Sequence, residues 1–246
     1  MERKCFVSLY GGKMKRKKYL LYTFALILSI LFALGVIQYQ NRYYNKEILR
    51  LSKQTEEEFR AMKLDGKQME WFRTHQISNH KRWLKEYEII LKDTKIFPVK
   101  PDTEHRAGWC YENSWKENRT YGGIRFHEGT DIIADNNKRG YFKVVSVSDG
   151  VVEKKGWLEK GGWRIGVRSP NGVYYYYAHL YDYAKGIEVG SKIHAGDVIG
   201  SMGDSGYSPI EGTVGNFCVH LHFGIYIDID GEEKSVNPYW ILKGIE

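Results

Sequence analysis

Val219-His220-Leu221-His222-Phe223 alternates apolar side chains with histidines, a pattern that indicates a β-strand. In a β-strand, side chains two positions apart lie on the same face of the sheet. We therefore expect His220 and His222 to point into one site while the three apolar side chains point into a core. A His-x-His pair is common without a metal, so its meaning depends on the rest of the sequence.

Two further strand-like segments supply histidines. Residues 125–132 read RFHEGTDI and contain His127, with Asp131 four positions later. Residues 177–180 read YAHL and contain His179. Imidazole nitrogen and carboxylate oxygen suit zinc, and three protein ligands with one open position characterise a catalytic zinc site.

A competing motif begins at His127. His127-Glu128 resembles the start of an H-E-x-x-H helix, in which the glutamate is the catalytic base. Gly129 and Thr130 form helices poorly, and position 131 holds Asp in place of His. We therefore expect Glu128 to be a solvated residue on a turn.

The chain beyond Pro98 predicts a mostly β domain. Short β-branched and aromatic runs are separated there by turns that contain Gly. Asn171-Gly172 and Asp230-Gly231 each join two such runs, and pairs of this kind are strong hairpin signals.

Strict alternation along residues 173–179 places Tyr175 and Tyr177 on the face of His179. Two interpretations stay open for these tyrosines. They line a substrate groove, or they pack against side chains of neighbouring strands.

The ordered motifs of residues 97–240 resemble the lysostaphin-like, or LytM-type, zinc endopeptidases of family M23. The pattern is H-x-x-x-D, a strand-end His, then H-x-H; further matches are Asp149-Gly150-Val151-Val152, Gly196-Asp197-Val198-Ile199-Gly200 and Val236-Asn237-Pro238. The resemblance implies that His127, Asp131 and His222 bind Zn²⁺. His179 and His220 resemble the family's unligated catalytic histidines. The fold implied is an antiparallel β-sheet that forms the floor of an open groove, and the implied activity is hydrolysis of peptide crosslinks in bacterial peptidoglycan.

Two features depart from the family pattern. Gly224 stands where many members have Glu after H-L-H-F, and residues 207–219 are longer than the usual link into H-x-H. Neither feature removes an expected ligand. Both concern the rim of the expected groove and hence the choice of crosslink.

An alternative function shares this scaffold. A peptidase-like domain that has lost turnover could bind cell wall or a protein partner outside the membrane. Completeness of the site separates the two functions, and all five expected polar side chains are present. We therefore expect an active zinc metalloendopeptidase, with the silent scaffold as the alternative.

The N-terminal part predicts a membrane anchor. Residues 1–18 carry a local net charge of +6, out of +7 for the whole chain, and residues 19–37 follow without a charged side chain. About 19 residues at 1.5 Å rise nearly cover a ~30 Å hydrocarbon core. By the positive-inside rule, residues 1–18 are a cytoplasmic tail and residues 38–246 lie outside. Ala33-Leu34-Gly35 is a poor cleavage site, which argues against a cleaved signal peptide.

Removal of the basic tail leaves a net charge of only +1 on the remaining residues. Nucleic acid is therefore not an expected partner, because its binding needs a basic surface on the folded domain. Two cysteines, Cys110 and Cys218, follow the anchor. We expect both to be buried free thiols, with a Cys110–Cys218 disulfide as the alternative.

Residues 38–96 are expected to form a helical stalk before the peptidase domain, residues 97–246. Apolar side chains recur at three- and four-residue intervals in residues 48–62 and again in residues 83–91. Such stripes need an apolar surface to pack on. The helices could pack on each other, on a protein partner or on the domain that follows.

Overall fold

The computed structural model describes residues 22–24, 26–39, 81–104 and 106–246. The predicted cytoplasmic tail and residues 40–80 of the predicted stalk lie outside these residues. The chain divides into two units, Met1–Gln54 and Thr55–Glu246, which are treated separately below.

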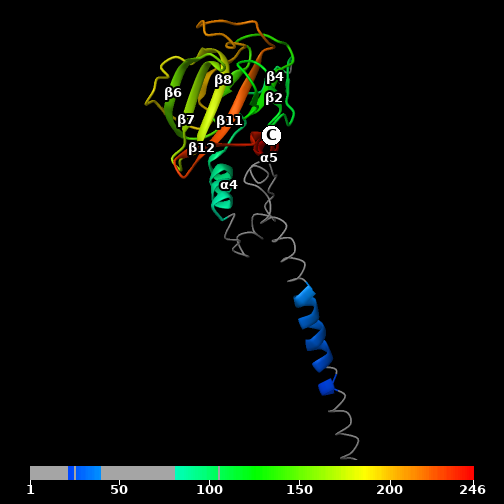
Figure 1. Cartoon of the computed structure of the whole chain (residues 1–246). Helices are drawn as coiled ribbons and strands as arrows, with labels where there is room; N and C mark the ends of the chain where they lie inside the picture. The colour runs from blue at the N-terminus through cyan, green and yellow to red at the C-terminus, as the bar shows by residue number, and fades with distance from the viewer. Residues whose placement is uncertain (1–21, 25, 40–80, 105) are drawn as a thin grey trace, which may run out of the picture. The chain divides into compact units, whose positions relative to one another are not determined.

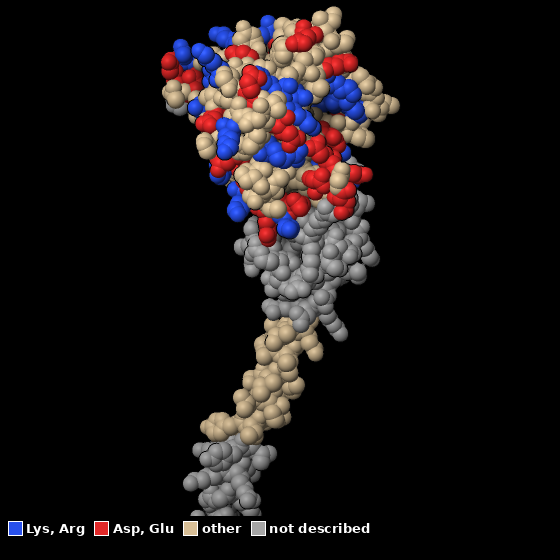
Figure 2. Space-filling view, turned by 90° about the vertical axis from the view of Figure 1, so that its left-hand side faces the viewer, with Lys and Arg blue, Asp and Glu red and all other residues tan. Residues whose placement is uncertain are grey.

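The first unit contains an apolar helix, Tyr22–Tyr39. The helix has 18 residues and a mean hydropathy of 1.9. It carries no Lys, Arg, Asp or Glu, as Figure 2 shows. By length and composition this helix could be a membrane span or a signal sequence.

The second unit is mostly antiparallel β-sheet, as the sequence predicts (Figure 1). Its elements are, in chain order, α4 (Lys81–Asp93), β1 (Trp109–Cys110), β2 (Asn118–Arg119), β3 (Arg125–Phe126), β4 (Thr130–Ala134), β5 (Lys143–Val145), β6 (Gly150–Leu158), β7 (Gly162–Arg168), β8 (Tyr174–Tyr183), β9 (Lys192–Ile193), β10 (Val198–Met202), β11 (His220–Ile229), β12 (Glu232–Val236) and α5 (Pro238–Ile245). The main sheet follows the order β1-β4-β11-β8-β7-β6-β9, so β11 and β8 lie at its centre. In addition, β12 pairs with β11, β10 pairs with β8 and β5, and β2 and β3 form a separate ribbon.

Strand β11 and the residue before it follow the alternation expected from the sequence. Val219, Leu221 and Phe223 are buried in the core, at 2%, 0% and 0% exposure. Their neighbours His220 and His222 point to the opposite face, where both line a pocket. One face of β11 therefore holds the core and the other holds the site.

Strand β8 interrupts its alternation at His179. This residue has a φ of 62°, a left-handed conformation that is uncommon for a residue with a side chain. The register with β7 shifts here, so β8 has one extra residue. As a result Tyr176 and His179 line the pocket, while Tyr175 and Tyr177 are fully buried. Of the two open interpretations for these tyrosines, packing against neighbouring strands is therefore the one observed.

Helix α4 contacts the β-domain at its C-terminal end, where the Asn171 Nδ2 donates to the Asp93 Oδ1 at 2.6 Å. Its side chains Tyr87 and Ile90 are 2% and 0% exposed. Directly after the helix, the Thr94 Oγ1 lies 2.9 Å from the Tyr175 hydroxyl. The end of the predicted stalk thus contacts the domain that follows, and a soluble version of the domain needs to begin before Lys81.

Cys110 and Cys218 are free and exposed. The expectation that both are buried is therefore wrong. Cys110 belongs to β1, at the edge of the main sheet, and Cys218 lies at the wall of the pocket just before β11.

Candidate active site

A pocket of about 540 Å³ lies over the polar face of β8 and β11. Its walls come from β2, β3, β4, the turn between β6 and β7, and the segment before β11. All five site residues expected from the sequence line this pocket: His127, Asp131, His179, His220 and His222. Segments nearly 100 residues apart in the chain therefore meet at one place.

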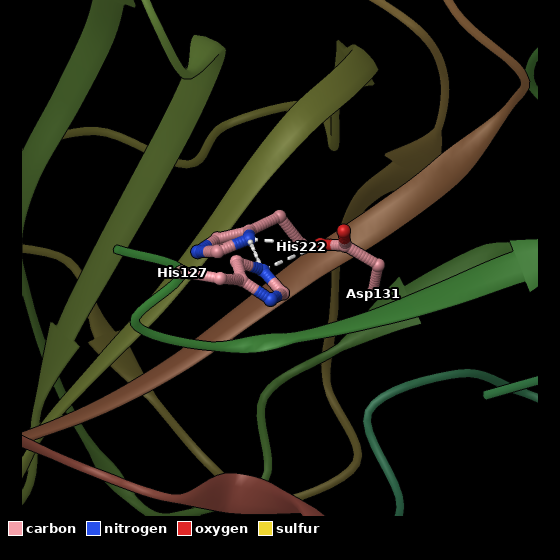
Figure 3. A group of neighbouring side chains, drawn as sticks. All are labelled: His127, Asp131 and His222. Atoms are coloured by element: carbon pink, nitrogen blue, oxygen red, sulfur yellow. Dashed lines mark hydrogen bonds and ion pairs between the residues drawn. The ribbon is translucent and has the colours of Figure 1, made fainter. Parts of the chain in front are cut away.

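Sheet register brings the three expected zinc ligands together. Asp131 of β4 lies directly opposite His222 of β11, and His127 precedes β4 in the short link from β3. The His127 Nε2 lies 3.0 Å from the His222 Nδ1 and 3.1 Å from the Asp131 Oδ1. The last pair, His222 Nδ1 and Asp131 Oδ1, is separated by 2.9 Å. Figure 3 shows the three side chains pointing toward one another.

These three donor atoms could hold a metal ion. With zinc–nitrogen distances of about 2.0–2.1 Å, tetrahedral ligands lie roughly 3.3 Å apart, which is close to the observed separations. Two nitrogens and one carboxylate oxygen are also the donor set of many catalytic zinc sites. The geometry and the donor chemistry therefore fit Zn²⁺.

Neighbouring groups orient the three side chains. The His127 Nδ1 lies 3.1 Å from the Ser114 carbonyl, so its N–H donates there and leaves Nε2 with a lone pair. Arg119 donates from Nη2 to the Asp131 Oδ2 at 2.7 Å, which leaves Oδ1 facing the histidines. Hydrogen bonds of this kind fix the orientation of metal ligands.

The other two histidines are held by backbone carbonyls. The His179 Nδ1 lies 2.7 Å from the Ser205 carbonyl, and the His220 Nδ1 lies 2.8 Å from the Cys218 carbonyl. Each Nδ1–H donates to its carbonyl, so each Nε2 is a proton acceptor. The two rings are 4.7 Å apart, and the His220 Nε2 is 3.9 Å from the Asp131 Oδ1. Two acceptor nitrogens therefore stand beside the three converging donors.

Burial sets the protonation of these groups. Burial, followed by the charges of His220 and His222, holds the pKa of His179 well below its ordinary value. Burial also lowers the pKa of His220 and of His222. For Asp131, burial alone would raise the pKa, but the interactions with the adjacent His127 and His222 outweigh it and lower the pKa. The lowered pKa values favour the neutral form of His179, His220 and His222 and the ionised form of Asp131.

The segment before β11, residues 207–219, builds one rim of the pocket. Its Tyr207 stacks on Tyr121 at 4.5 Å, and its Phe217 packs edge-on against His179 at 4.7 Å.

Glu128 forms an ion pair with Lys116 at 3.1 Å, and its side chain is 43% exposed.

Sequence reasoning did not single out several residues that line the pocket: Arg119, Arg125, Lys160, Tyr176 and Tyr226. Tyr226 could have been found by continuing the alternation of β11 from His222. The ring of Tyr226 covers Gly224, where an added Cβ would lie 2.8 Å from it. The small residue at this departure from the family pattern thus makes room for an aromatic wall.

The chain is similar to several known proteins. Residues 125–238 match the model of peptidase family M23. The chain is 44% identical over 170 residues to the L-Ala–D-Glu endopeptidase of Bacillus subtilis (strain 168), covering 69% of this chain and 49% of that protein. It is 32% identical over 149 residues to the glycyl-glycine endopeptidase ALE-1 of Staphylococcus capitis, covering 57% of this chain and 37% of that protein. The chain thus spans about half or less of the length of these curated relatives.

A solved structure is similar over a larger share of both chains. The crystal structure of a lytM protein from Ruminococcus gnavus ATCC 29149 has 48% sequence identity and a TM-score of 0.62. The match covers 72% of this chain and 70% of that one. Together with the sheet and the pocket described above, these similarities show that the chain belongs to peptidase family M23.

Proposed function

We propose that this protein is a zinc-dependent endopeptidase that hydrolyses peptide bonds of bacterial peptidoglycan. The observation that carries the proposal is the meeting, in one open pocket, of three side chains that could hold a metal ion and two further histidines. The proposal agrees with the similarity to two endopeptidases, one named for L-Ala–D-Glu and one for glycyl-glycine bonds.

We assign the zinc to His127 Nε2, Asp131 Oδ1 and His222 Nδ1, whose separations fit a tetrahedral shell. A zinc ion bound there would activate water and polarise the scissile carbonyl as a Lewis acid. Three protein ligands leave the fourth position open, as this chemistry requires.

His179 and His220 are assigned the proton transfers. Their Nδ1–H groups are tied to backbone carbonyls, so each Nε2 is free to accept a proton from the attacking water. Once protonated, the same Nε2–H can stabilise the developing oxyanion or protonate the leaving amine. Their low pKa values favour the neutral form from which the reaction begins.

The test uses the full-length protein in detergent micelles, loaded with zinc. Purified cell walls with glycine bridges and walls with direct crosslinks are incubated separately, and new peptide ends are identified by mass spectrometry. We expect specific cleavage that a zinc chelator abolishes. Absence of new ends from both wall types would contradict the proposal.

Gly129 provides a local test of the ligand set. A Cβ at this position would lie 2.6 Å from the His222 Nε2 and 2.8 Å from the Phe223 carbonyl oxygen. We expect Gly129→Ala to displace the His222 ring and to lower zinc affinity by roughly 10–100-fold, the range seen when groups that orient ligands are disturbed. Zinc titration checks this result. Gly244→Ala, where an added Cβ meets nothing within 4 Å, is the control and should leave affinity unchanged.

We further propose that the Tyr22–Tyr39 helix stays in the membrane, with the peptidase domain outside the cytoplasm. The observation behind this proposal is an apolar helix that directly follows the basic residues 1–18. Protease added to intact protoplasts should then remove the C-terminal domain. Protection of the domain, or its release as a species cut near Gly35, would contradict this topology.

Residues 38–96 could also present a surface to a protein partner. Because the apolar side chains Tyr87 and Ile90 of α4 are already buried, such a surface is expected within residues 38–80.

A further inference from the structure

One end of the pocket is cationic. Arg119, Arg125 and Lys160 all line it. Arg119 and Arg125 are directly opposite partners in the ribbon of β2 and β3, where paired side chains share a face about 5 Å apart. Lys160 comes from the turn between β6 and β7, and its Nζ would lie 3.4 Å from a Cβ at Gly122, in the turn of the same ribbon. Two walls of the pocket therefore bring three cations to one place.

The acidic groups of the pocket do not neutralise this end. Asp131 is paired with Arg119 at 2.7 Å, and Glu128 is paired with Lys116 at 3.1 Å. Among the described residues, no carboxylate lies within ion-pair distance of Arg125 or Lys160. Two positive charges consequently remain without an anion, and like charges on a cross-strand pair repel each other.

Neutral groups hold the Arg125 guanidinium in position. Its Nε donates to the Tyr121 carbonyl at 3.2 Å, and its Nη2 donates to the Tyr207 hydroxyl at 3.0 Å. The guanidinium also lies over the Tyr207 ring, 5.7 Å from its centre. A planar guanidinium that is held by neutral partners keeps its full charge and suits a carboxylate.

We propose that this cationic end binds a carboxylate of the substrate, on a residue that adjoins the scissile bond. This inference rests on the proposed peptidase function and narrows the substrate to an acidic peptide. The position follows from Arg119, which contacts the candidate ligand Asp131 and stands opposite Arg125. A bridge of glycines within a crosslink offers no such carboxylate, so it is the poorer substrate.

The test compares two peptides that differ in one group. Both contain an L-alanyl–D-glutamyl bond and continue through the glutamyl side chain, so that one carries a free α-carboxylate and the other an α-carboxamide. Binding of each labelled peptide to the full-length protein in micelles is measured by fluorescence anisotropy, with chelator present to stop turnover. We expect the carboxylate peptide to bind about 10–100-fold more tightly, as for hydrogen bonds to a charged group.

Three variants assign this preference to the cationic end. Arg125→Gln and Lys160→Gln should each remove most of it, and Arg125→Lys should retain part because it keeps the charge and loses the planar fork. Arg106→Gln and Lys192→Gln change exposed cations that do not line the pocket, and they should retain the preference in full.

Hydrolysis of the same two peptides by the zinc-loaded protein separates the two proposals. If the preference depends on Arg125 and Lys160 but neither the peptides nor either wall type is cleaved, the peptidase proposal fails and the carboxylate site stands. Equal binding of the two peptides overturns the carboxylate site, whether or not they are cleaved. Equal peptide binding together with Arg125-dependent binding of poly(glycerol phosphate) would assign the cationic end to phosphate instead, and it overturns the inference as well.

Discussion

Replacing His222 by alanine is expected to remove both bound zinc and peptidase turnover. Its Nδ1 lies within 3.0 Å of the His127 Nε2 and 2.9 Å from the Asp131 Oδ1, so it supplies one of the three converging donors. Losing even a group that orients a ligand costs about 10–100-fold in metal affinity, and losing the ligand itself costs at least as much. Zinc content after equilibration with a chelator buffer, and hydrolysis rates on cell wall, measure the two losses.

His194 supplies the matched control for this variant. It is a histidine whose side chain is 81% exposed and which does not line the pocket. His194→Ala should keep full zinc content and full turnover. Circular dichroism of His222→Ala should retain the β-sheet spectrum, because Leu221 and Phe223 on the core face are unchanged. Full zinc occupancy in His222→Ala would show that the ligand set is wrong.

The sequence predicts the centre of the sheet well because β11 is regular. Side chains alternate between the two faces along this strand. The sequence therefore predicts correctly that Leu221 lies on the core face and His222 on the site face. The sequence likewise identified His127 and Asp131, four positions apart, as candidate ligands. Their convergence with His222 depends on the register of β4 against β11, which only the folded sheet sets.

Strand β8 shows why alternation fails as a general guide. One extra residue and the left-handed backbone of His179 reverse the faces on either side of that position. Tyr176, which was not expected at the site, faces the pocket, and Tyr175 and Tyr177 join the core. A β-bulge has no periodic signal in the sequence, because it depends on how the strand pairs with another strand.

The cationic end of the pocket was not predictable from the sequence for a related reason. Strands β2 and β3 have two residues each, which is too short for any periodic signal. Arg119 and Arg125 therefore appear in the sequence as ordinary charged residues. Only the pairing of the ribbon and its position beside β4 bring them to the pocket.

The second large effect is expected when His179 or His220 is replaced by alanine. Both imidazoles lie at the site without joining the three converging donors, so each variant should retain zinc. Each should nevertheless lose roughly 10²–10⁴ in turnover, the usual contribution of a positioned acid, base or oxyanion donor. Zinc analysis and hydrolysis rates on the purified full-length variants give both numbers.

Comparison within β11 makes this test specific. His220 and His222 lie on one face of the same strand, two positions apart, so replacing either should disturb the sheet to a similar extent. His220→Ala should lose turnover alone, while His222→Ala should lose zinc and turnover together. Wild-type turnover in both His179→Ala and His220→Ala would remove the proposed proton-transfer roles. A zinc-loaded wild type that cleaves no wall type would instead favour the silent scaffold. The site would then bind zinc through its ligands without catalysing hydrolysis.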